Sequence, residues 1–469
     1  MKRTKIVCTI GPASDKPETL KKLIKAGMNV ARLNFSHNVL AYHAKVIKNI
    51  RQLAQESNQP IAIIQDLQGP RIRLGDLPLV GIELKKNTEV ILTTGKRNAK
   101  KISVTYKNMH LDVKPKQRVL IADGTIELLV EKVKGQDVIC RVVVEGTIFS
   151  HKGINLPDTN VRIQLFSDKD KKDLIFGVKQ EVDYVALSFV RTAQDVLTLK
   201  KMIKAASIKL KKTKLDIKVI VKIEKPEAIK NFDAILAVTD AVMIARGDLG
   251  IEMSAEDIPV IQKMIINKCL HASKPVIVAT QMLDSMINNP RPTRAEASDV
   301  ANAVIDHTDA VMLSGETASG KYPVEAVETM SRIINKTENS VYDNMVLKEI
   351  ARFATATDDV MANVVKKIST KVRPRAIIVA TRSGYSARIV SRYRPEVSMW
   401  VVSENRKTAQ QLNLCWGITS FVLPRVKDYE ELLNQAIQYL KENKKIKAGD
   451  KLVVIAGLLE LNRVEIRVA

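Results

Sequence analysis

The chain alternates short apolar runs with amphipathic segments over most of its length. The runs that resemble buried strands span residues 5–10, 28–34, 61–66, 184–189, 218–223, 241–245, 275–280 and 310–313. Runs of this length are typical of strands buried on both faces of a parallel sheet. Between most of them, apolar residues recur at spacings of three and four, as in PETLKKLIKAG, which predicts helices. This alternation predicts a (β/α)8 barrel. The alternative is an open doubly wound sheet, but no GxGxxG motif follows any of these runs.

The alternation is interrupted once, between residues 70 and 161. Short alternating runs such as TEVILTT and KQRVLIAD occur there, separated by glycine-containing turns. This pattern predicts a small antiparallel β domain inserted into a loop between a strand and a helix. Such loops lie at the catalytic face of a barrel, so we expect the inserted domain to act as a lid.

A third unit begins after residue 341. Its predicted strands span residues 376–381, 399–403, 419–423, 451–456 and 464–468, with helical segments between them. We therefore predict three domains: a barrel formed by residues 1–69 and 162–341, a β lid domain at 70–161, and a C-terminal α/β domain at 342–469.

The charge balance is strongly basic. Lys and Arg total 75 against 51 Asp and Glu, which gives a net charge of +24. Such an excess is compatible with nucleic acid, acidic surfaces or anionic substrates. The lysines, however, are scattered over helix-like segments, aromatic residues make up only 4%, and no nucleic-acid recognition motif accompanies the charge. We favour a solvated basic face and expect no specific nucleic-acid partner.

Cysteine usage and hydropathy predict a cytoplasmic location. Cys8, Cys140, Cys269 and Cys415 form no CxxC motif and no Cys/His ligand spacing, which predicts buried thiols in a reducing compartment. The apolar run near the N-terminus is too short for a signal peptide. No run approaches the ~18 apolar residues of a membrane span, so we expect no membrane association.

Charged residues gather at the end of two neighbouring predicted strands. Lys222 and Glu224 lie two residues apart, so they share a face where one strand ends. Asp248 follows the next strand. Two carboxylates and an ammonium group suit a hard divalent cation and a phosphoryl group, whose transfer depends on positioning and charge neutralisation. A simple salt bridge between strand ends is the alternative for any single pair.

The same rim carries further polar residues. They are Arg32, Asn34, Ser36, His37, Asp66, Arg73, Thr280, Gln281 and the segment SGETASG at 314–320. Nearly every polar interruption of a predicted strand lies at its C-terminal end, which is where barrel enzymes carry out their chemistry.

These residues also carry a resemblance to a known family. IARGDLGIE with KIE upstream, ARLNFSH, GPASD, ATQMLDSMI, RPTRAEASDVANAV and LSGETASGKYP together resemble the pyruvate kinase family, in order and over essentially the whole chain. The resemblance implies a barrel, an inserted lid and a C-terminal regulatory-type domain. It also implies phosphoryl transfer from phosphoenolpyruvate to ADP in glycolysis, which gives pyruvate and ATP, and a homotetramer.

The resemblance implies roles for the residues of the rim. Glu224 and Asp248 correspond to ligands of Mg²⁺ (or Mn²⁺), which prefers one or two carboxylates together with substrate oxygens and water. Lys222 corresponds to the lysine that stabilises the transferring phosphoryl group and the enolate oxygen. Backbone N–H groups at Ala245, Gly247 and Asp248 correspond to the holder of the substrate carboxylate.

Further roles follow from the same resemblance. Arg32 corresponds to an arginine that clamps the phosphate, where a planar fork suits better than a lysine. Thr280 corresponds to a threonine near the enolate carbon, where we expect it to order a water relay; capping of the next helix is the alternative. The residues assigned to the nucleotide are Asn34, His37, Arg73 and Lys152. Ser188 and Phe189 are expected to shape the pocket wall.

One departure from the family pattern concerns the monovalent cation. The resemblance assigns K⁺ to Asn34, Ser36, Asp66 and the carbonyl of Leu67. This chain reads QDLQGPRIR, where Leu67 replaces a threonine and Arg71 replaces a glutamate. A fixed guanidinium group supplies positive charge and repels a bound cation. We therefore predict activity without K⁺; an Arg71 side chain that turns to solvent is the alternative.

A second departure lies in the C-terminal domain. TRSGYSAR resembles a loop that grips the phosphate of a sugar-phosphate activator, which assigns Thr381, Ser383, Gly384, Ser386 and Arg388 to an effector. Only a few residues separate the last two predicted strands, where the family has a long glycine-rich loop. A shorter effector and no effector remain equally open.

Two other classes of function were weighed. One is a different barrel enzyme of phosphoenolpyruvate, which the order of lid and C-terminal domain disfavours. The other is an inactive regulator or nucleic-acid-binding relative that uses the basic charge. Such a relative is expected to have lost Lys222, Glu224 or Asp248, and all three are present.

Overall fold

Eight parallel strands close into a barrel at the centre of the molecule. A computed structural model describes residues 2–95, 98, 100–343, 357–457 and 463–469. The barrel order is β1-β17-β16-β15-β14-β13-β3-β2. The strands are β1 (Lys5–Thr9), β2 (Val30–Asn34), β3 (Ala62–Asp66), β13 (Tyr184–Leu187), β14 (Lys218–Ile223), β15 (Ala241–Ala245), β16 (Val276–Ala279) and β17 (Ala310–Leu313). The predicted barrel is confirmed.

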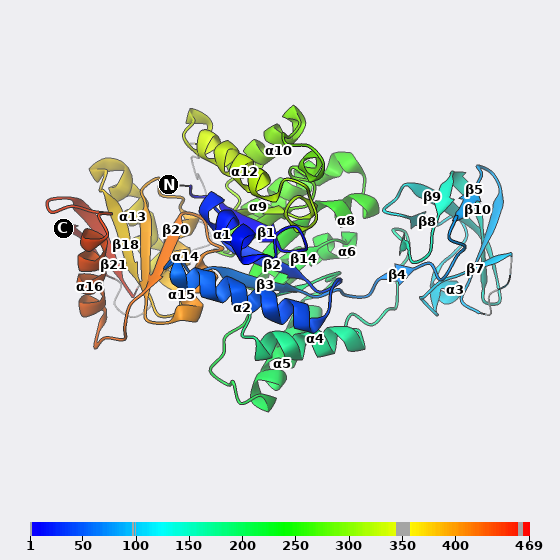
Figure 1. The fold of residues 1–469 in the computed structure, drawn as a ribbon, viewed down its shortest axis with the longest axis horizontal. Coiled ribbons are helices and arrows are strands. Elements are labelled where there is room, and N and C mark those ends of the chain that lie inside the picture. The colour runs from blue at the N-terminus through cyan, green and yellow to red at the C-terminus, as the bar shows by residue number, and fades with distance from the viewer. Residues whose placement is uncertain (1, 96–97, 99, 344–356, 458–462) are drawn as a thin grey trace.

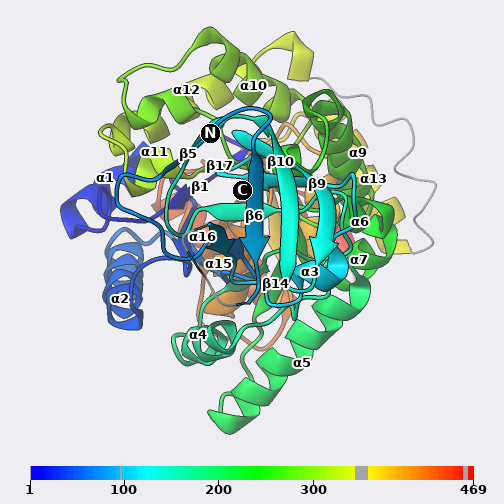
Figure 2. The ribbon, with the colours of Figure 1, turned by 90° about the vertical axis from the view of Figure 1, so that its right-hand side faces the viewer.

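Helices surround the barrel (Figure 2). They are α1 (Pro17–Ala26), α2 (Leu40–Glu56), α4 (Asp168–Lys179), α5 (Ala193–Lys209), α6 (Pro226–Lys230), α7 (Phe232–Val238), α8 (Arg246–Glu252), η1 (Ala255–Asp257), α9 (Ile258–His271), η2 (Asp284–Ile287), α10 (Arg294–Ile305), α11 (Gly315–Ala318), α12 (Pro323–Glu338) and η3 (Val341–Asp343). The starts of α4, α5 and α10 follow from capping boxes at Ser167, Thr192 and Thr293, in which a hydroxyl and an acidic side chain satisfy amides of the first turn.

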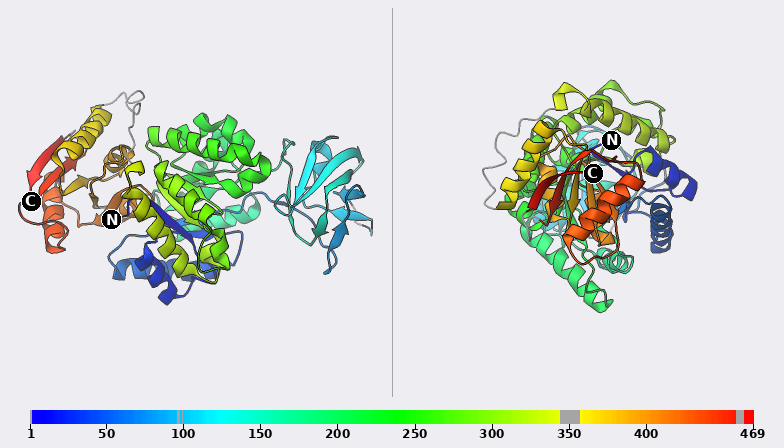
Figure 3. Two further views of the ribbon diagram at one scale, coloured as in Figure 1. Left: turned by 90° about the horizontal axis from the view of Figure 1, so that it is seen from above. Right: turned by 90° about the vertical axis from the view of Figure 1, so that its left-hand side faces the viewer.

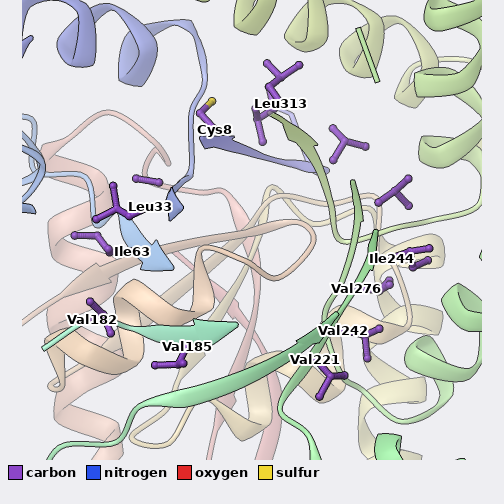
Figure 4. Close-up of a cluster of buried hydrophobic side chains, with 14 of the residues drawn as sticks. Cys8, Leu33, Ile63, Val182, Val185, Val221, Val242, Ile244, Val276 and Leu313 are labelled. Atoms are coloured by element: carbon purple, nitrogen blue, oxygen red, sulfur yellow. The ribbon is translucent and has the colours of Figure 1, made fainter. Parts of the chain in front are cut away.

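The strands are buried on both faces because alternate residues pack in two separate clusters. Val221, Val242 and Val276 face the helices (Figure 4), whereas Ile220 and Met243 fill the barrel interior. Each fully buried aliphatic side chain contributes roughly 1.5–3 kcal/mol relative to exposure. Because both faces are buried, the strand sequences are continuous apolar runs. The first polar side chains after each run therefore lie at the rim, where the strand ends.

The inserted domain projects from one end of the barrel (Figure 1). Its elements are β4 (Ile72–Arg73), β5 (Ile82–Leu84), β6 (Glu89–Thr93), β7 (Lys101–Ser103), α3 (Met109–Asp112), β8 (Arg118–Ile121), β9 (Ile126–Lys134), β10 (Asp137–Val144), β11 (Gly146–Ile148) and β12 (Gly153–Asn155). Most neighbouring strands are antiparallel, as predicted. The pair β6–β7, at one edge of the sheet, is parallel.

The C-terminal domain packs against the opposite end of the barrel, which we call the barrel floor (Figures 1 and 3). Its elements are α13 (Thr357–Val372), β18 (Ala376–Ala380), α14 (Tyr385–Arg392), β19 (Met399–Ser403), α15 (Arg406–Leu412), β20 (Ile418–Val422), α16 (Tyr429–Glu442), β21 (Lys451–Ala456) and β22 (Arg463–Val468). The sheet order is β20-β19-β18-β21-β22, and only β22 runs antiparallel.

Hydrogen bonds join this domain to the barrel floor. Tyr184 Oη donates to Gln411 O at 2.8 Å, and Lys5 Nζ donates to Ile418 O at 2.5 Å. The predicted domain limits stay predictions. The short connection predicted between the last two strands includes residues 458–462, which lie outside the described residues.

Two predictions from composition are addressed by the fold. All four cysteines are free and buried, as expected for thiols that pack as small apolar groups. In the part of the chain that the structure describes, no helix has both the length and the apolar character needed to cross a membrane.

Candidate active site

Lys222 lies at the centre of a buried polar network at the rim of the barrel. Its Nζ lies 2.7 Å from Glu224 Oε1 and 3.5 Å from Asp66 Oδ1, and it donates to Ser188 Oγ at 2.9 Å. Lys222 is 7% exposed and Glu224 is 1% exposed. The strands β3, β13 and β14 bring these residues together. Because the network is buried, its charges interact more strongly than they would in water.

Burial and charge act in opposite directions on this lysine. Burial alone lowers the pKa of Lys222, but the carboxylates of Asp66 and Glu224 outweigh it, so the net pKa is raised. Burial raises the pKa of Asp66, and the positive charges of Lys222 and Arg32 reverse this to a net lowering. Lys222 and Asp66 are therefore both charged.

Arg32 is held by two partners on neighbouring strands. Its Nε donates to Asp66 Oδ2 at 2.7 Å, a second nitrogen lies 2.6 Å from the same oxygen, and Nη1 donates to Thr9 Oγ1 at 2.8 Å. These contacts fix the planar guanidinium group at the rim, beside Asp66 and the lysine network.

Glu224 is a buried carboxylate with a raised pKa, as expected for a side chain that binds a cation. Burial, together with the negative charge of Asp248, raises its pKa to about 7, against the opposing effects of Lys222 and the Phe189 amide. Phe189 N donates to Glu224 Oε2 at 2.7 Å. A divalent ion beside these carboxylates would offset their mutual repulsion.

The carboxylates of Glu224 and Asp248 fit magnesium better than a metal that is coordinated by three or four protein side chains. Within the described residues, no group of three or more His, Cys, Asp or Glu side chains is arranged to hold an ion. Magnesium is commonly held by one or two carboxylates, with substrate oxygens and water completing its shell. Glu224 and Asp248 can supply that number.

Thr280 connects β16 to the start of α8. Its Oγ1 accepts a hydrogen bond from Gly247 N at 2.7 Å and donates to Ala279 O at 2.5 Å. Arg246 Nη2 donates to Thr280 O at 2.8 Å. The threonine therefore binds the first turn of a preceding helix, and η2, the next helical turn, begins without a side-chain cap. The alternative of a cap on the next helix is not observed.

Backbone strain is concentrated at the same point. Thr280 has φ 72° and Gln281 has φ 54°. A β-branched residue in this left-handed region is a true outlier, and such strain is common where a side chain must be aimed into a site. A Cβ on Gly247 would lie 3.4 Å from Thr280 Oγ1, which is ordinary contact.

The predicted monovalent-cation ligands are engaged within the protein. Asn34 Oδ1 accepts from Ser36 N at 3.1 Å, and Leu67 O accepts from Ser188 Oγ at 2.8 Å. Asp66 faces Arg32 and Lys222, as described above. The oxygens of Asn34, Asp66 and Leu67 therefore already have partners, and the Asp66 carboxylate is paired with two cations.

Arg71 is exposed and makes no ion pair with any described residue. It lines a cavity of about 820 Å³ between the inserted domain and the rim, which Phe189 and Asp248 also line. The side chain thus borders the site while its charge contacts solvent. This observation fits both a fixed positive charge near the site and the solvent-facing alternative.

The residues predicted to contact a nucleotide border the inserted domain. Arg73 Nη1 donates to His151 O at 2.9 Å, and Lys152 O accepts from Leu74 N at 2.9 Å. His37 is exposed on the barrel side; its pKa is lowered by partial burial and by nearby arginines, Arg71 first. The set is therefore divided between two domains.

A bridge between the inserted domain and the barrel was missed at the level of sequence. Glu252 Oε1, at the end of α8, accepts from Asn155 Nδ2 at 2.9 Å and from Lys225 Nζ at 2.6 Å. Lys225 directly follows the KIE motif, and Glu252 ends the GIE segment. The place of Lys225 and Glu252 beside these two motifs indicates that they lie near the rim. It does not predict their contact, because the two residues are far apart in sequence.

The predicted effector loop lies far from the rim, where β18 leads into α14. Thr381 Oγ1 accepts from Gly384 N at 3.0 Å, and Gly384 has φ 79°, which favours glycine. Thr381 and Ser386 are buried, whereas Ser383 and Arg388 line a cavity at the barrel floor. The five residues thus do not share one open surface.

The fold and this rim can be compared with known proteins. The family model for the pyruvate kinase barrel domain matches residues 1–327, and the model for the pyruvate kinase alpha/beta domain matches residues 359–464. The chain belongs to the pyruvate kinase family. A pyruvate kinase from Clostridium acetobutylicum is 42% identical over 462 residues, which cover 98% of this chain and 96% of the relative.

Other pyruvate kinases agree with this assignment. Pyruvate kinase 2 of Synechocystis is 44% identical over 465 residues, which cover 98% of this chain and 77% of that protein. The crystal structure of a pyruvate kinase from Cryptosporidium parvum has a TM-score of 0.93 at 37% identity and covers 100% of this chain and 96% of that one. The predicted family, fold and phosphotransferase activity, from phosphoenolpyruvate to ADP, are confirmed. The roles of single residues stay predictions.

Proposed function

We propose that phosphoryl transfer takes place at the barrel rim, around Lys222. The observation that carries this proposal is the contact of a buried ammonium group with two carboxylates, Glu224 at 2.7 Å and Asp66 at 3.5 Å. Such an arrangement keeps the lysine charged in a site from which water is largely excluded. A fixed positive charge there favours a transition state in which negative charge moves from the phosphoryl group to an enolate oxygen.

Glu224 and Asp248 would hold Mg²⁺ or Mn²⁺. The ion would supply positive charge to the phosphoryl oxygens and help to orient them. Within the chain, the buried position of Glu224 and the charge of Asp248 raise the pKa of Glu224 to about 7. A bound cation would offset the unfavourable free energy of ionising this carboxyl group.

Arg32 is proposed to bind the phosphate of phosphoenolpyruvate. Its contacts with Asp66 and Thr9 fix the guanidinium plane before substrate arrives. A side chain that is already oriented loses less entropy on binding and so adds more to affinity.

The start of α8 and Thr280 are proposed to handle the pyruvate end of the substrate. Backbone N–H groups at Ala245, Gly247 and Asp248 would hold its carboxylate. The Gly247 amide now donates to Thr280, so substrate would share or replace this bond. The strained Thr280 hydroxyl would order the water that delivers a proton to the enolate carbon.

ADP or ATP is proposed to bind beneath the inserted domain. Arg73 and Lys152 would contact its phosphates from the inserted domain, while Asn34 and His37 would contribute from the barrel. A cavity between these two domains is lined by Ile72 and Gly153, the sequence neighbours of Arg73 and Lys152. Closure of the inserted domain would exclude water during transfer.

We also propose that K⁺ is not required for activity. Arg71 brings a permanent positive charge to the edge of the same cavity, and Asp66, the only carboxylate of the predicted K⁺ site, is already neutralised by Arg32 and Lys222. A cytoplasmic homotetramer remains part of the proposal from family resemblance, as do the predicted domain limits.

Replacement of the central lysine tests the proposal. Lys222→Met should lower kcat by a factor of about 10²–10³, the size seen when one charge-stabilising group is lost from a site, with a much smaller change in phosphoenolpyruvate affinity. The measurement is a coupled lactate dehydrogenase assay with phosphoenolpyruvate, ADP and Mg²⁺. Lys204→Met, which alters an exposed lysine on α5, is the matched control. Retention of full turnover in Lys222→Met would disprove the assignment.

A further inference from the structure

The loop of residues 35–39, between β2 and α2, adjoins or carries two of the residues proposed to contact the nucleotide. Asn34 ends β2, and His37 lies within the loop. The His37 side chain is exposed, and its pKa is lowered by partial burial and then by the charges of Arg71 and Arg73. His37 therefore lies beside the cations at the edge of the site, and its position depends on how this loop is held.

The loop has few hydrogen bonds of its own. Ser36 N donates to Asn34 Oδ1 at 3.1 Å, and His37 N donates to Asn34 O at 3.3 Å. Asn38 has φ 65°, and Val39 precedes α2 without a side-chain hydrogen bond to the helix. The start of α2 is thus not fixed by the kind of capping box that begins α4, α5 and α10.

His43, in the first turn of α2, reaches back to this loop. Its Nε2 lies 3.0 Å from His37 O, and because a carbonyl oxygen only accepts, Nε2 carries a proton and donates it. The side chain is buried, and its Nδ1 has no hydrogen-bond partner among the residues that the structure describes. Burial lowers the pKa of His43, against the opposing effects of the His37 carbonyl and Asp173. The imidazole is therefore neutral, with its proton on the nitrogen that faces the loop.

Aromatic neighbours fix the orientation of this imidazole. The ring stacks on Phe35, with centroids 4.0 Å apart and planes 12° from parallel, and Tyr42 meets it edge-on at 5.5 Å. Phe35 is itself buried, and its N–H donates to Asp66 O at 2.9 Å. Because rotation of the imidazole would break the stack, the ring keeps its N–H directed at His37 O.

A second side chain holds the same loop from another helix. Lys169 Nζ, in the first turn of α4, donates to Phe35 O at 2.5 Å and to Asp173 Oδ2 at 2.5 Å. The carbonyls of Phe35 and His37 are thus each bound by a side chain that is not itself proposed to contact substrate. Two helices that lie outside the strands therefore determine where this part of the rim lies.

We propose that His43 is a positioning residue for nucleotide binding: its N–H holds the His37 carbonyl and so fixes the loop beside Asn34 that carries His37. This inference rests on the proposed nucleotide contacts of these two residues. A loop that is already in place loses less entropy when the nucleotide binds. Phosphoenolpyruvate should be affected little, because contacts with the neighbouring strands fix Arg32 independently of His43.

Two substitutions of His43 isolate its N–H group. His43→Leu removes the donor, whereas His43→Gln also loses the ring but retains a side-chain N–H. Steady-state kinetics of the full chain should show that the KM for ADP rises about three- to tenfold in His43→Leu, the effect of one lost hydrogen bond. The KM for phosphoenolpyruvate and kcat should change little, and His43→Gln should restore most of the affinity for ADP.

Val46→Ala is the control for a purely structural effect. Val46 is a buried core residue of the same helix, and its truncation lowers stability through a cavity without removing a contact of the loop. Both KM values should stay at their wild-type levels in this variant. A parallel rise of the two KM values in His43→Leu would overturn the positioning role, as would equal effects of His43→Leu and His43→Gln.

His37→Ala separates this inference from the proposed function, because it removes the imidazole of His37 but keeps the carbonyl that His43 holds. If His37→Ala raises the KM for ADP and His43→Leu does not, the nucleotide contact stands and the positioning role is lost. If neither variant changes the KM for ADP, the proposed nucleotide contact of His37 is lost as well.

Hydrogen–deuterium exchange gives a measurement that does not depend on activity. The amides of Ser36 and His37 should exchange faster in His43→Leu than in wild type, because their hydrogen bonds to Asn34 depend on a loop that is held in place. Exchange in Val46→Ala should match wild type in this segment. Equal exchange of the segment in wild type and His43→Leu would contradict the proposal.

Discussion

Lys222 keeps its positive charge in a buried position because two carboxylates outweigh the effect of burial on its pKa. Asp66 has a matching role, since it is held ionised by Lys222 and Arg32. The network thus pre-forms positive charge at the rim before any substrate binds. At the scale of single residues, each buried charge of the site depends on a partner of opposite charge. Without that partner, burial would favour the neutral form of the group.

Arg71 provides the sharpest test at this scale. Arg71→Glu would place a negative charge at the border of the cavity and remove the fixed cation. We expect activity without K⁺ to fall by at least about tenfold and to be largely restored by added K⁺, because a mobile cation would then supply the missing charge. The measurement is the coupled assay in buffers free of K⁺ and Na⁺.

Arg425→Glu is the control for this substitution, since Arg425 is exposed in the C-terminal domain. Strong K⁺ activation of the wild-type chain, or a lack of response to K⁺ in Arg71→Glu, would count against the role of Arg71.

At the scale of elements, the junction between a strand and the next helix both positions the site and stabilises the barrel. Thr280 at the end of β16 binds the first turn of α8, and Glu296 of α10 accepts from the amide and hydroxyl of Ser285 at 2.7 and 2.6 Å. The same Glu296 completes the capping box of α10 with Thr293. One acidic side chain therefore fixes both a helix start and the loop beyond the strand.

Removal of this cap should cost a measurable amount of stability. Thr293→Ala deletes the hydroxyl that accepts from Glu296 N, and we expect the free energy of unfolding to fall by about 1 kcal/mol. Urea denaturation measures the change. Thr198→Ala, at a half-buried position within α5, is the control and should change stability by less than about 0.5 kcal/mol. Equal effects in the two variants would refute the capping role.

The inserted domain is held to α8 by the bridge at Glu252. Asn155→Ala removes one of its two donors, so the domain should close less often over the barrel. We expect the KM for ADP to rise several-fold and the KM for phosphoenolpyruvate to change little, because only the nucleotide is proposed to contact both domains. Steady-state kinetics measure both constants. Asn160→Ala, at a nearby exposed position, is the control; a parallel rise of both constants would argue against the bridge.

Elements differ in how well the sequence predicts them. The barrel strands were predictable because burial on both faces produces apolar runs, and the site residues because polar side chains appear where those runs end. The parallel pairing of β6 with β7 was not, since short alternating runs carry no information on strand direction. The contacts of Arg32 with Asp66 and of Asn155 with Glu252 join residues far apart in sequence, so spacing alone does not reveal them.

At the scale of the whole molecule, a buried ionic junction joins the barrel floor to the C-terminal domain. Arg394 Nη2 donates to His307 O at 2.8 Å and lies 3.1 Å from Asp309 Oδ2, and Arg3 lies 2.7 Å from Asp343. His307 Nδ1 lies 3.8 Å from Asp343 Oδ1, but its pKa is lowered to about 3, by burial first and then by the charges of Arg394, Arg3 and Lys366. The junction therefore holds a neutral histidine.

This histidine predicts a dependence of stability on pH. Between pH 3 and its ordinary pKa of 6.5, the unfolded chain binds a proton at His307 that the folded chain does not. The contribution to stability is present above pH 6.5 and is lost as pH falls, by up to about 1.4 kcal/mol per unit. His307→Asn should remove this part of the slope, since asparagine tolerates the φ of 60° found there.

Urea denaturation of both proteins at pH 5 and pH 7 measures the difference. Because Asp343 is present in both, its own titration largely cancels from the comparison. Identical slopes for wild type and His307→Asn would contradict the neutral state of the buried imidazole.

The inserted domain leaves the barrel through β4 and returns through β12, and these two short strands pair with each other. A module whose two connections run side by side can swing about a single line without disturbing the register of the barrel. Arg73 and the residue next to β12, Lys152, lie at that line. Groups that lie on the axis of such a motion stay in place, so both cations would keep their positions beside the nucleotide while the rest of the inserted domain swings.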